Sequence, residues 1–129
     1  MSDLKQAGFQ TGDILAQLNS AIQSFSDGEK KDLQKKTNTI FELQIKNKEG
    51  VEATWTIDVK NEPKIHKGAG TAKPGVTLIM ADETFQALAG GKLDGQRAFM
   101  SGKLKTKGNM MLATKLDGVL KAAKAKAKL

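Results

Sequence analysis

Residues 41–60 read FELQIKNKEGVEATWTIDVK, and this stretch decides the fold. Apolar and polar residues alternate on both sides of the turn sequence NKEG. Successive side chains of a β-strand point to opposite faces of a sheet, so the pattern predicts a hairpin with one buried face and one face in water. The apolar set comprises Phe41, Leu43, Ile45, Val51, Ala53, Trp55, Ile57 and Val59.

Upstream of the hairpin, the spacing changes to that of helices. Residues 11–25, TGDILAQLNSAIQSF, place Ile14, Leu15, Leu18, Ile22 and Phe25 on one stripe, which predicts an amphipathic helix. Ser26 and Glu29 form the S-x-x-E pattern of a capping box. This pattern predicts that a second, highly charged helix starts there and extends to about Lys36.

Downstream, residues 61–75 predict a loop with a short strand around Ile65, and residues 76–80 predict a further strand. Asp82 is placed to cap a helix over DETFQALAG, which Gly90 and Gly91 end. We expect a helical turn over residues 95–100, a strand over 103–107, and a final helix capped by Asn109. The apolar stripe of that helix comprises Leu112, Leu116, Val119, Leu120 and Ala123.

Strands and helices come in blocks without regular βαβ alternation, which favours an α+β fold: about five strands in one sheet, with helices on its apolar face. The length of 129 residues fits a single domain over 1–129, with 124–129 as a flexible tail. The chain has no cysteine, which excludes disulfides, thiolate catalysis and cysteine-ligated metals. It also has no apolar run of membrane-spanning length and no hydrophobic signal region, so we expect an intracellular protein.

Catalytic and cofactor motifs give no support for an enzyme. His66 is the only histidine and has no clustered carboxylate, so it predicts neither a metal site nor a catalytic triad. The glycines at 68 and 70 fit neither the Walker nor the dinucleotide pattern, because no strong strand is predicted before them, no helix is predicted after them, and Lys73 is not followed by Ser or Thr. We therefore expect no metal, no cofactor and no catalytic residues.

The net charge of +7 is concentrated in the last third, where ten basic residues from Lys92 onward oppose two acidic ones. Such asymmetry indicates an acidic partner: nucleic acid, anionic lipid, a phosphate-bearing ligand or a receptor that binds the tail. Single-strand nucleic-acid readers carry aromatics for base stacking, but aromatics are only 5% of this chain. Methionines 100, 110 and 111 fit either an adaptable lipid cavity or an ordinary core, and periodicity does not separate the two.

The segment RAFMSGKLKTKGNMMLATKLDGVL, residues 97–120, closely resembles the C-terminal signature of the sterol carrier protein 2 family. The family pattern F-x-x-G-K-L-K-x-x-G-N-x-x-x-A-x-K-L is matched by Phe99, Gly102, Lys103, Leu104, Lys105, Gly108, Asn109, Ala113, Lys115 and Leu116. The segments TWTIDVKN and DETFQALAGGKLDGQRAFM also occur in the family's order. The resemblance implies a mixed, mostly antiparallel five-stranded sheet covered by about five helices, which together enclose a hydrophobic tunnel.

The resemblance also implies a non-enzymatic carrier of fatty acids, fatty acyl-CoA esters and sterols. A basic α+β nucleic-acid-binding domain is the alternative. Gln96, Arg97 and residues 20–23 are candidates for the polar end of the ligand. The expected tunnel walls are Ile14, Leu18, Ile22, Phe25, Phe41, Trp55, Ile57, Phe85, Leu88, Phe99, Met100, Leu104, Met110, Met111, Leu112, Leu116 and Leu120.

Two basic segments are expected to contact partners. Lys103, Lys105 and Lys107 lie on the strand face opposite the apolar residues, where they would attract anionic membranes or the phosphates of coenzyme A. Ala127, Lys128 and Leu129 resemble the peroxisomal targeting tripeptide. The sequence therefore predicts a monomer of the peroxisomal matrix that is recognised by the peroxisomal import receptor.

Overall fold

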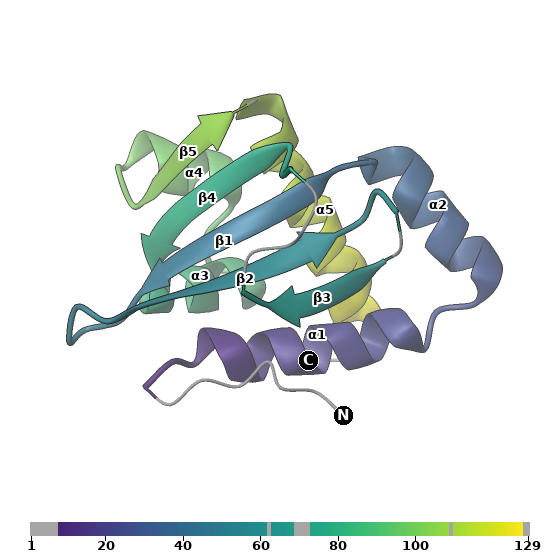
Figure 1. Ribbon diagram of the computed structural model, residues 1–129, viewed down its shortest axis with the longest axis horizontal. Coiled ribbons are helices and arrows are strands. Elements are labelled where there is room, and N and C mark those ends of the chain that lie inside the picture. The colour runs from purple at the N-terminus through teal and green to yellow at the C-terminus, as the bar shows by residue number, and fades with distance from the viewer. Residues whose placement is uncertain (1–7, 62, 69–72, 109, 128–129) are drawn as a thin grey trace.

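A computed structural model describes residues 8–61, 63–68, 73–108 and 110–127, with the side chains of Met110, Ala113 and residues 124–127 outside the described part. Helices and strands follow one another in the predicted order (Figure 1). They are α1 Thr11–Gln23, α2 Asp27–Thr37, β1 Ile40–Lys46, β2 Glu52–Asp58, β3 Lys64–Lys67, β4 Val76–Ala81, α3 Asp82–Ala89, α4 Gly95–Met100, β5 Leu104–Gly108 and α5 Met110–Ala127.

The described strands form one sheet in the order β3-β2-β1-β4-β5. β1 pairs with β2, β2 with β3 and β4 with β5 in antiparallel fashion, whereas β1 and β4 run parallel. Figure 1 shows α3, α4 and α5 behind the sheet, α1 along its β3 side and α2 beyond one end. The α+β class and the mixed, mostly antiparallel sheet are thus confirmed, and one face of the sheet carries none of the described helices.

The core lies between the sheet and the helices, as the alternation predicted. In the hairpin register Phe41 lies opposite Ile57, and both side chains are fully buried with Trp55. Phe9 covers Trp55 edge-on, with ring centroids 5.6 Å apart. Val51 departs from the prediction and is 49% exposed, because it lies before β2 in the turn, where its carbonyl accepts a hydrogen bond from the amide of Asn47 at 2.9 Å.

The helix starts confirm one capping prediction and correct another. Ser26 Oγ accepts a hydrogen bond from the amide of Glu29 at 3.2 Å, and Glu29 Oε1 accepts one from the amide of Ser26 at 2.8 Å, which completes the capping box of α2. Asp82 does not cap its own helix, whose N-cap is Ala81. Its carboxylate instead accepts hydrogen bonds from the start of α1.

The last helix is longer than predicted. α5 continues to Ala127 and so extends into the segment 124–129, whose flexibility stays a prediction. Alanine and lysine both have high helix propensity, so the repeated Ala-Lys segment extends the helix without an apolar stripe. Asn109, the predicted cap, lies outside the described residues.

Candidate functional site

An apolar groove of ≈570 Å³ lies between α2 and α5. Its apolar lining comes from Phe25, Leu33, Gly118 and Ala122, and its rim carries charged groups from both helices. The charged residues are Glu29, Asp32, Lys36 and Lys121, and Thr37 completes the lining. The arrangement suits a narrow apolar molecule with a polar end in water.

Local sequence explains why the groove forms at this place. α2 is strongly polar, and Leu33 and Thr37 are its buried residues. Opposite it, α5 presents Gly118 and Ala122, which are one helical turn apart and therefore on one side of the helix. Apart from its chain neighbours and the backbone of its own helix, no atom of the described residues lies within 4 Å of a Cβ built on Gly118, so the small residues leave open space there.

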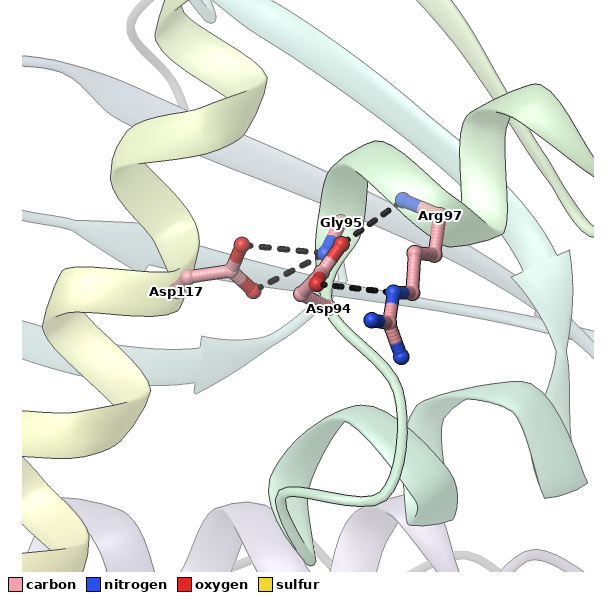
Figure 2. A network of polar contacts seen from close by, with 4 residues as sticks. All are labelled: Asp94, Gly95, Arg97 and Asp117. Atoms are coloured by element: carbon pink, nitrogen blue, oxygen red, sulfur yellow. Dashed lines mark hydrogen bonds and ion pairs between the residues drawn. The ribbon is translucent and has the colours of Figure 1, made fainter.

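Polar contacts hold α5 against α4 (Figure 2). Asp117 of α5 accepts hydrogen bonds from the amide of Gly95, at 2.9 Å and 3.2 Å to its two carboxylate oxygens. Asp94 caps α4 by accepting the amide of Arg97 at 2.7 Å, and its other oxygen lies 3.7 Å from Arg97 Nε. Burial raises the pKa of Asp117; the Gly95 hydrogen bond, which lowers this pKa, only partly offsets it.

Gly95 leaves room for this contact, because a Cβ at residue 95 would lie 3.2 Å from Asp117 Oδ2 and the carboxylate would have to shift by a few tenths of an ångström. A second hollow of ≈410 Å³ adjoins the same contact and is lined by both Asp94 and Asp117. Leu88 and Leu120 supply apolar lining there. Lys121 lines both the groove and this hollow, so the two openings lie on either side of one residue.

A family model described as the SCP-2 sterol transfer family matches residues 18–121. This span includes α2 and the part of α5 up to Lys121. The chain belongs to the SCP-2 sterol transfer family. The match confirms the relationship indicated by the signature at residues 97–120.

Similar proteins of about the same length are known within the family. The chain is 38% identical to the oleate-induced peroxisomal protein of Candida maltosa, over 95% of each chain. It is 37% identical to a fatty acid-binding protein of Yarrowia lipolytica, over 93% of this chain and 95% of the relative. The apo form of sterol carrier protein 2 from Yarrowia lipolytica superimposes with a TM-score of 0.85 at 36% identity, covering 93% of this chain and 96% of that one.

Most of the predicted tunnel residues lie together in the core of this SCP-2 fold. They form one apolar cluster that is almost completely inaccessible to solvent, so they pack against each other and the enclosed tunnel stays a prediction. The buried members are Leu18, Ile22, Phe41, Trp55, Ile57, Phe85, Leu88, Leu104, Leu116 and Leu120, with Ile14, Phe25 and Leu112 at the edge of the cluster. Of the predicted set, Phe25 lines the groove.

Three of the predicted tunnel residues lie on the surface instead. Met100 is 77% exposed, Met111 76% and Phe99 39%. The short α4 buries Ala98 against the core, and the next two residues of the helix therefore point away from it. The side chain of Met110 lies outside the described part.

The predicted polar-end residues are not part of the groove. Gln96 and Arg97 are exposed on α4, and Arg97 is paired with Asp94. Except for Phe25, the predicted site lacked the groove residues. The apolar and small ones among them are Leu33, Gly118 and Ala122, and the polar ones are Glu29, Asp32, Lys36, Thr37 and Lys121. The sequence indicated these residues only weakly: Leu33 is a single leucine in a charged helix, and Gly118 and Ala122 are small residues four positions apart.

Two further findings concern only the described part of the chain. It contains no group of three or more His, Cys, Asp or Glu side chains that could hold a metal ion. None of its helices is long and apolar enough to cross a membrane.

Proposed function

We propose that this protein is a non-enzymatic carrier that binds fatty acids and fatty acyl-CoA esters, with sterols as a further ligand class. The observation that carries the proposal is the groove between α2 and α5, which has an apolar lining and a charged rim. Its volume of ≈570 Å³ falls within the range of about 300–1,000 Å³ that is usual for small-molecule sites. Membership of the SCP-2 sterol transfer family supports this ligand class.

An acyl chain needs few polar contacts to bind in such a place. Each buried methylene contributes about 0.8 kcal/mol, so a long chain gains most of its affinity from leaving water. The groove adjoins the core through Phe25 and Leu33, and α5 forms one wall. We propose that the chain enters here and extends toward the core side of α5.

The polar end of the ligand is proposed to stay at the rim. Lys36 Nζ lies 3.1 Å from Asp32 Oδ2, and both side chains are well exposed. Exposed ion pairs contribute little free energy, so this lysine can exchange its partner for a ligand carboxylate. Lys121 lies on the opposite wall of the groove. These two lysines replace Gln96 and Arg97 as the proposed polar contacts.

We also propose that the carrier acts in the peroxisomal matrix, as a monomer. The proposal is supported by a relative named an oleate-induced peroxisomal protein, which matches over 95% of both chains. Import would depend on Ala127, Lys128 and Leu129, of which the last two lie outside the described residues. The partner would be the peroxisomal import receptor.

The test of the binding site is a substitution that fills the groove. Gly118→Leu places a side chain into open space on α5, and we expect it to lower the affinity for a dansyl-labelled fatty acid at least tenfold, measured by fluorescence titration. Gly28→Leu is the matched control, because Gly28 is also helical, also has room for a side chain, and lies outside the groove. Full affinity in the Gly118→Leu variant, with a melting temperature like that of the control, would refute the groove as the site.

The same titration separates the carrier from a nucleic-acid-binding domain. Fatty-acid binding driven by apolar burial changes little with salt, whereas binding to an oligonucleotide falls steeply as salt rises. Salt-steep oligonucleotide binding together with no uptake of fatty acid would overturn the carrier proposal.

A further inference from the structure

One margin of the molecule combines exposed lysines with exposed apolar side chains. Residues 95–116 contain five basic residues and no acidic one. They form α4, β5 and the start of α5, and Figure 1 shows β5 at the end of the sheet with α4 behind it. α4 and α5 both contact β5. We give the name β5 margin to the edge of the molecule that carries the exposed residues of these elements, Phe99, Met100, Lys103, Lys105, Lys107 and Met111.

The lysines of the β5 margin are not balanced by neighbouring acids. In the register with β4, Lys105 lies opposite Ile79 and Lys107 opposite Thr77, and β4 has no charged residue. The register continues from Lys107 through Thr77 to Glu42, but Glu42 lies on β1, two strands and about 10 Å away from Lys107. Within the described part of the chain, neither Lys103, Lys105 nor Lys107 forms an ion pair.

The exposed apolar side chains are concentrated at the same margin. Among the described residues, the large apolar side chains that are exposed are Phe99, Met100, Met111 and Val51, and only Val51 lies elsewhere, in the turn between β1 and β2. Met100 comes four residues before β5 begins, and Met111 three residues after it ends. The long, flexible methionine side chains therefore lie beyond both ends of a basic strand.

We propose that the β5 margin docks the protein on an anionic phospholipid bilayer, with the lysines on lipid phosphates and Phe99, Met100 and Met111 inserted at the acyl boundary. Basic residues combined with exposed apolar ones are the composition of surfaces that lie in a membrane interface. An acidic protein or a nucleic acid would use the charges and leave the methionines in water. The choice of a bilayer rests on the proposed carrier function, since a carrier must collect and deliver its lipid at membranes.

The expected size of the effect follows from the charges. Each lysine near an anionic surface changes affinity about fivefold, so the loss of three gives about a hundredfold. The apolar side chains add affinity that does not depend on lipid charge, and we expect about a tenfold loss when both exposed methionines become polar. Added salt should weaken wild-type binding through the lysine contribution alone.

The experiment is flotation of the full chain with vesicles of phosphatidylcholine, with or without phosphatidylserine. The test variants are Lys103→Gln, Lys105→Gln and Lys107→Gln combined, and Met100→Gln and Met111→Gln combined. The charge control is the triple change of Lys31, Lys35 and Lys48 to Gln, which removes three exposed lysines away from the margin. Val51→Gln is the apolar control.

We expect the wild type to bind the anionic vesicles, with the stated losses for both test variants and a change of at most about twofold for both controls. Equal losses in the lysine control, or unchanged binding in both test variants, would overturn the proposal. Oligonucleotide binding that needs the lysines but not the methionines, without vesicle binding, would overturn it in favour of nucleic acid. Fatty-acid titration in solution tests the carrier function separately. If the test variants take up fatty acid normally and also bind vesicles normally, the membrane-docking proposal is contradicted and the carrier function is not.

Discussion

Asp82 caps a helix that begins 71 residues before it: its Oδ1 accepts hydrogen bonds from the amide of Thr11 at 2.8 Å and from Thr11 Oγ1 at 2.6 Å. Its Oδ2 accepts the amide of Gln10 at 2.9 Å. α1 has no cap from its own N-cap residue, so this carboxylate satisfies amides that the helix leaves free and lies at its positive end. The contact joins the start of α1 to the start of α3.

Removal of this long-range cap should destabilise the fold. We expect Asp82→Ala to lower the free energy of unfolding by about 1–3 kcal/mol, because three hydrogen bonds to one carboxylate are lost together. The measurement is urea denaturation followed by tryptophan fluorescence. Glu83→Ala removes an adjacent, exposed carboxylate from the same first turn of α3 and should change stability much less. Equal losses in both variants would mean that the charge near α3, and not the bonds to α1, matters.

The carboxyl of Asp117 gives a pH-dependent contribution to stability, and this dependence comes from its burial, which outweighs the opposite effect of the Gly95 hydrogen bond on its pKa. Burial raises the folded-state pKa of Asp117, so the folded state holds this proton more tightly than the unfolded state does. Its contribution is therefore fully present below the unfolded pKa of about 3.9 and is lost as pH rises through the folded value. We expect the unfolding free energy of the wild type minus that of Asp117→Asn to fall with rising pH across this window. A difference that stays constant or rises would contradict the assignment.

Gly75 allows α5 to pack closely on the start of β4. A Cβ at residue 75 would collide with Oγ1 of the buried Thr39 and lie 3.0 Å from Cδ1 of Leu112. We expect Gly75→Ala to lower the denaturation midpoint, at a cost of about 1–3 kcal/mol. Gly118→Ala is the matched change on α5, where open space and better helix propensity predict a gain of up to about 1 kcal/mol. A gain at both positions would show that Thr39 and Leu112 can move aside.

The proposed import signal predicts a specific loss of localisation. Deletion of Leu129 from a fusion with fluorescent protein at the N-terminus should leave the fusion outside peroxisomes, because the receptor recognises the tripeptide as a unit. The measurement is colocalisation with a peroxisomal marker in cells. Lys124→Gln, which removes a nearby charge and leaves the tripeptide intact, should still be imported. Peroxisomal import of the deletion variant would require a different signal.

The sequence predicted the elements well because their patterns are local. The alternation in residues 41–60 and the Ser26–Glu29 capping box depend only on near neighbours, and both are confirmed. The Asp82 cap was assigned to the wrong helix because its partner, Thr11, is brought near only by the tertiary fold. The amino-acid pattern around Asp82 fits both roles.

The candidate site was less predictable for a related reason. Periodicity shows which residues share a side of a helix but not what covers that side. Methionine is an apolar residue type that is common in protein cores, yet Met100 and Met111 are exposed. The reason is that α4 is short and that α5 packs on the sheet with a different stripe of residues. The groove depends on the distance between α2 and α5, which neither segment encodes alone.

The parallel pairing of β1 with β4 has a consequence for the order in which the chain assembles. β1 lies at the centre of the sheet, between β2 and β4. β2 follows β1 in the chain after a short turn, whereas β2 and β3 both separate β4 from β1. Closing the longer loop costs more chain entropy, so the β1–β2–β3 meander should form first. Before β4 pairs with it, β1 is an edge strand that can pair with another chain. We expect hydrogen exchange measured early in folding to show protection of the amides in β2 before those in β4.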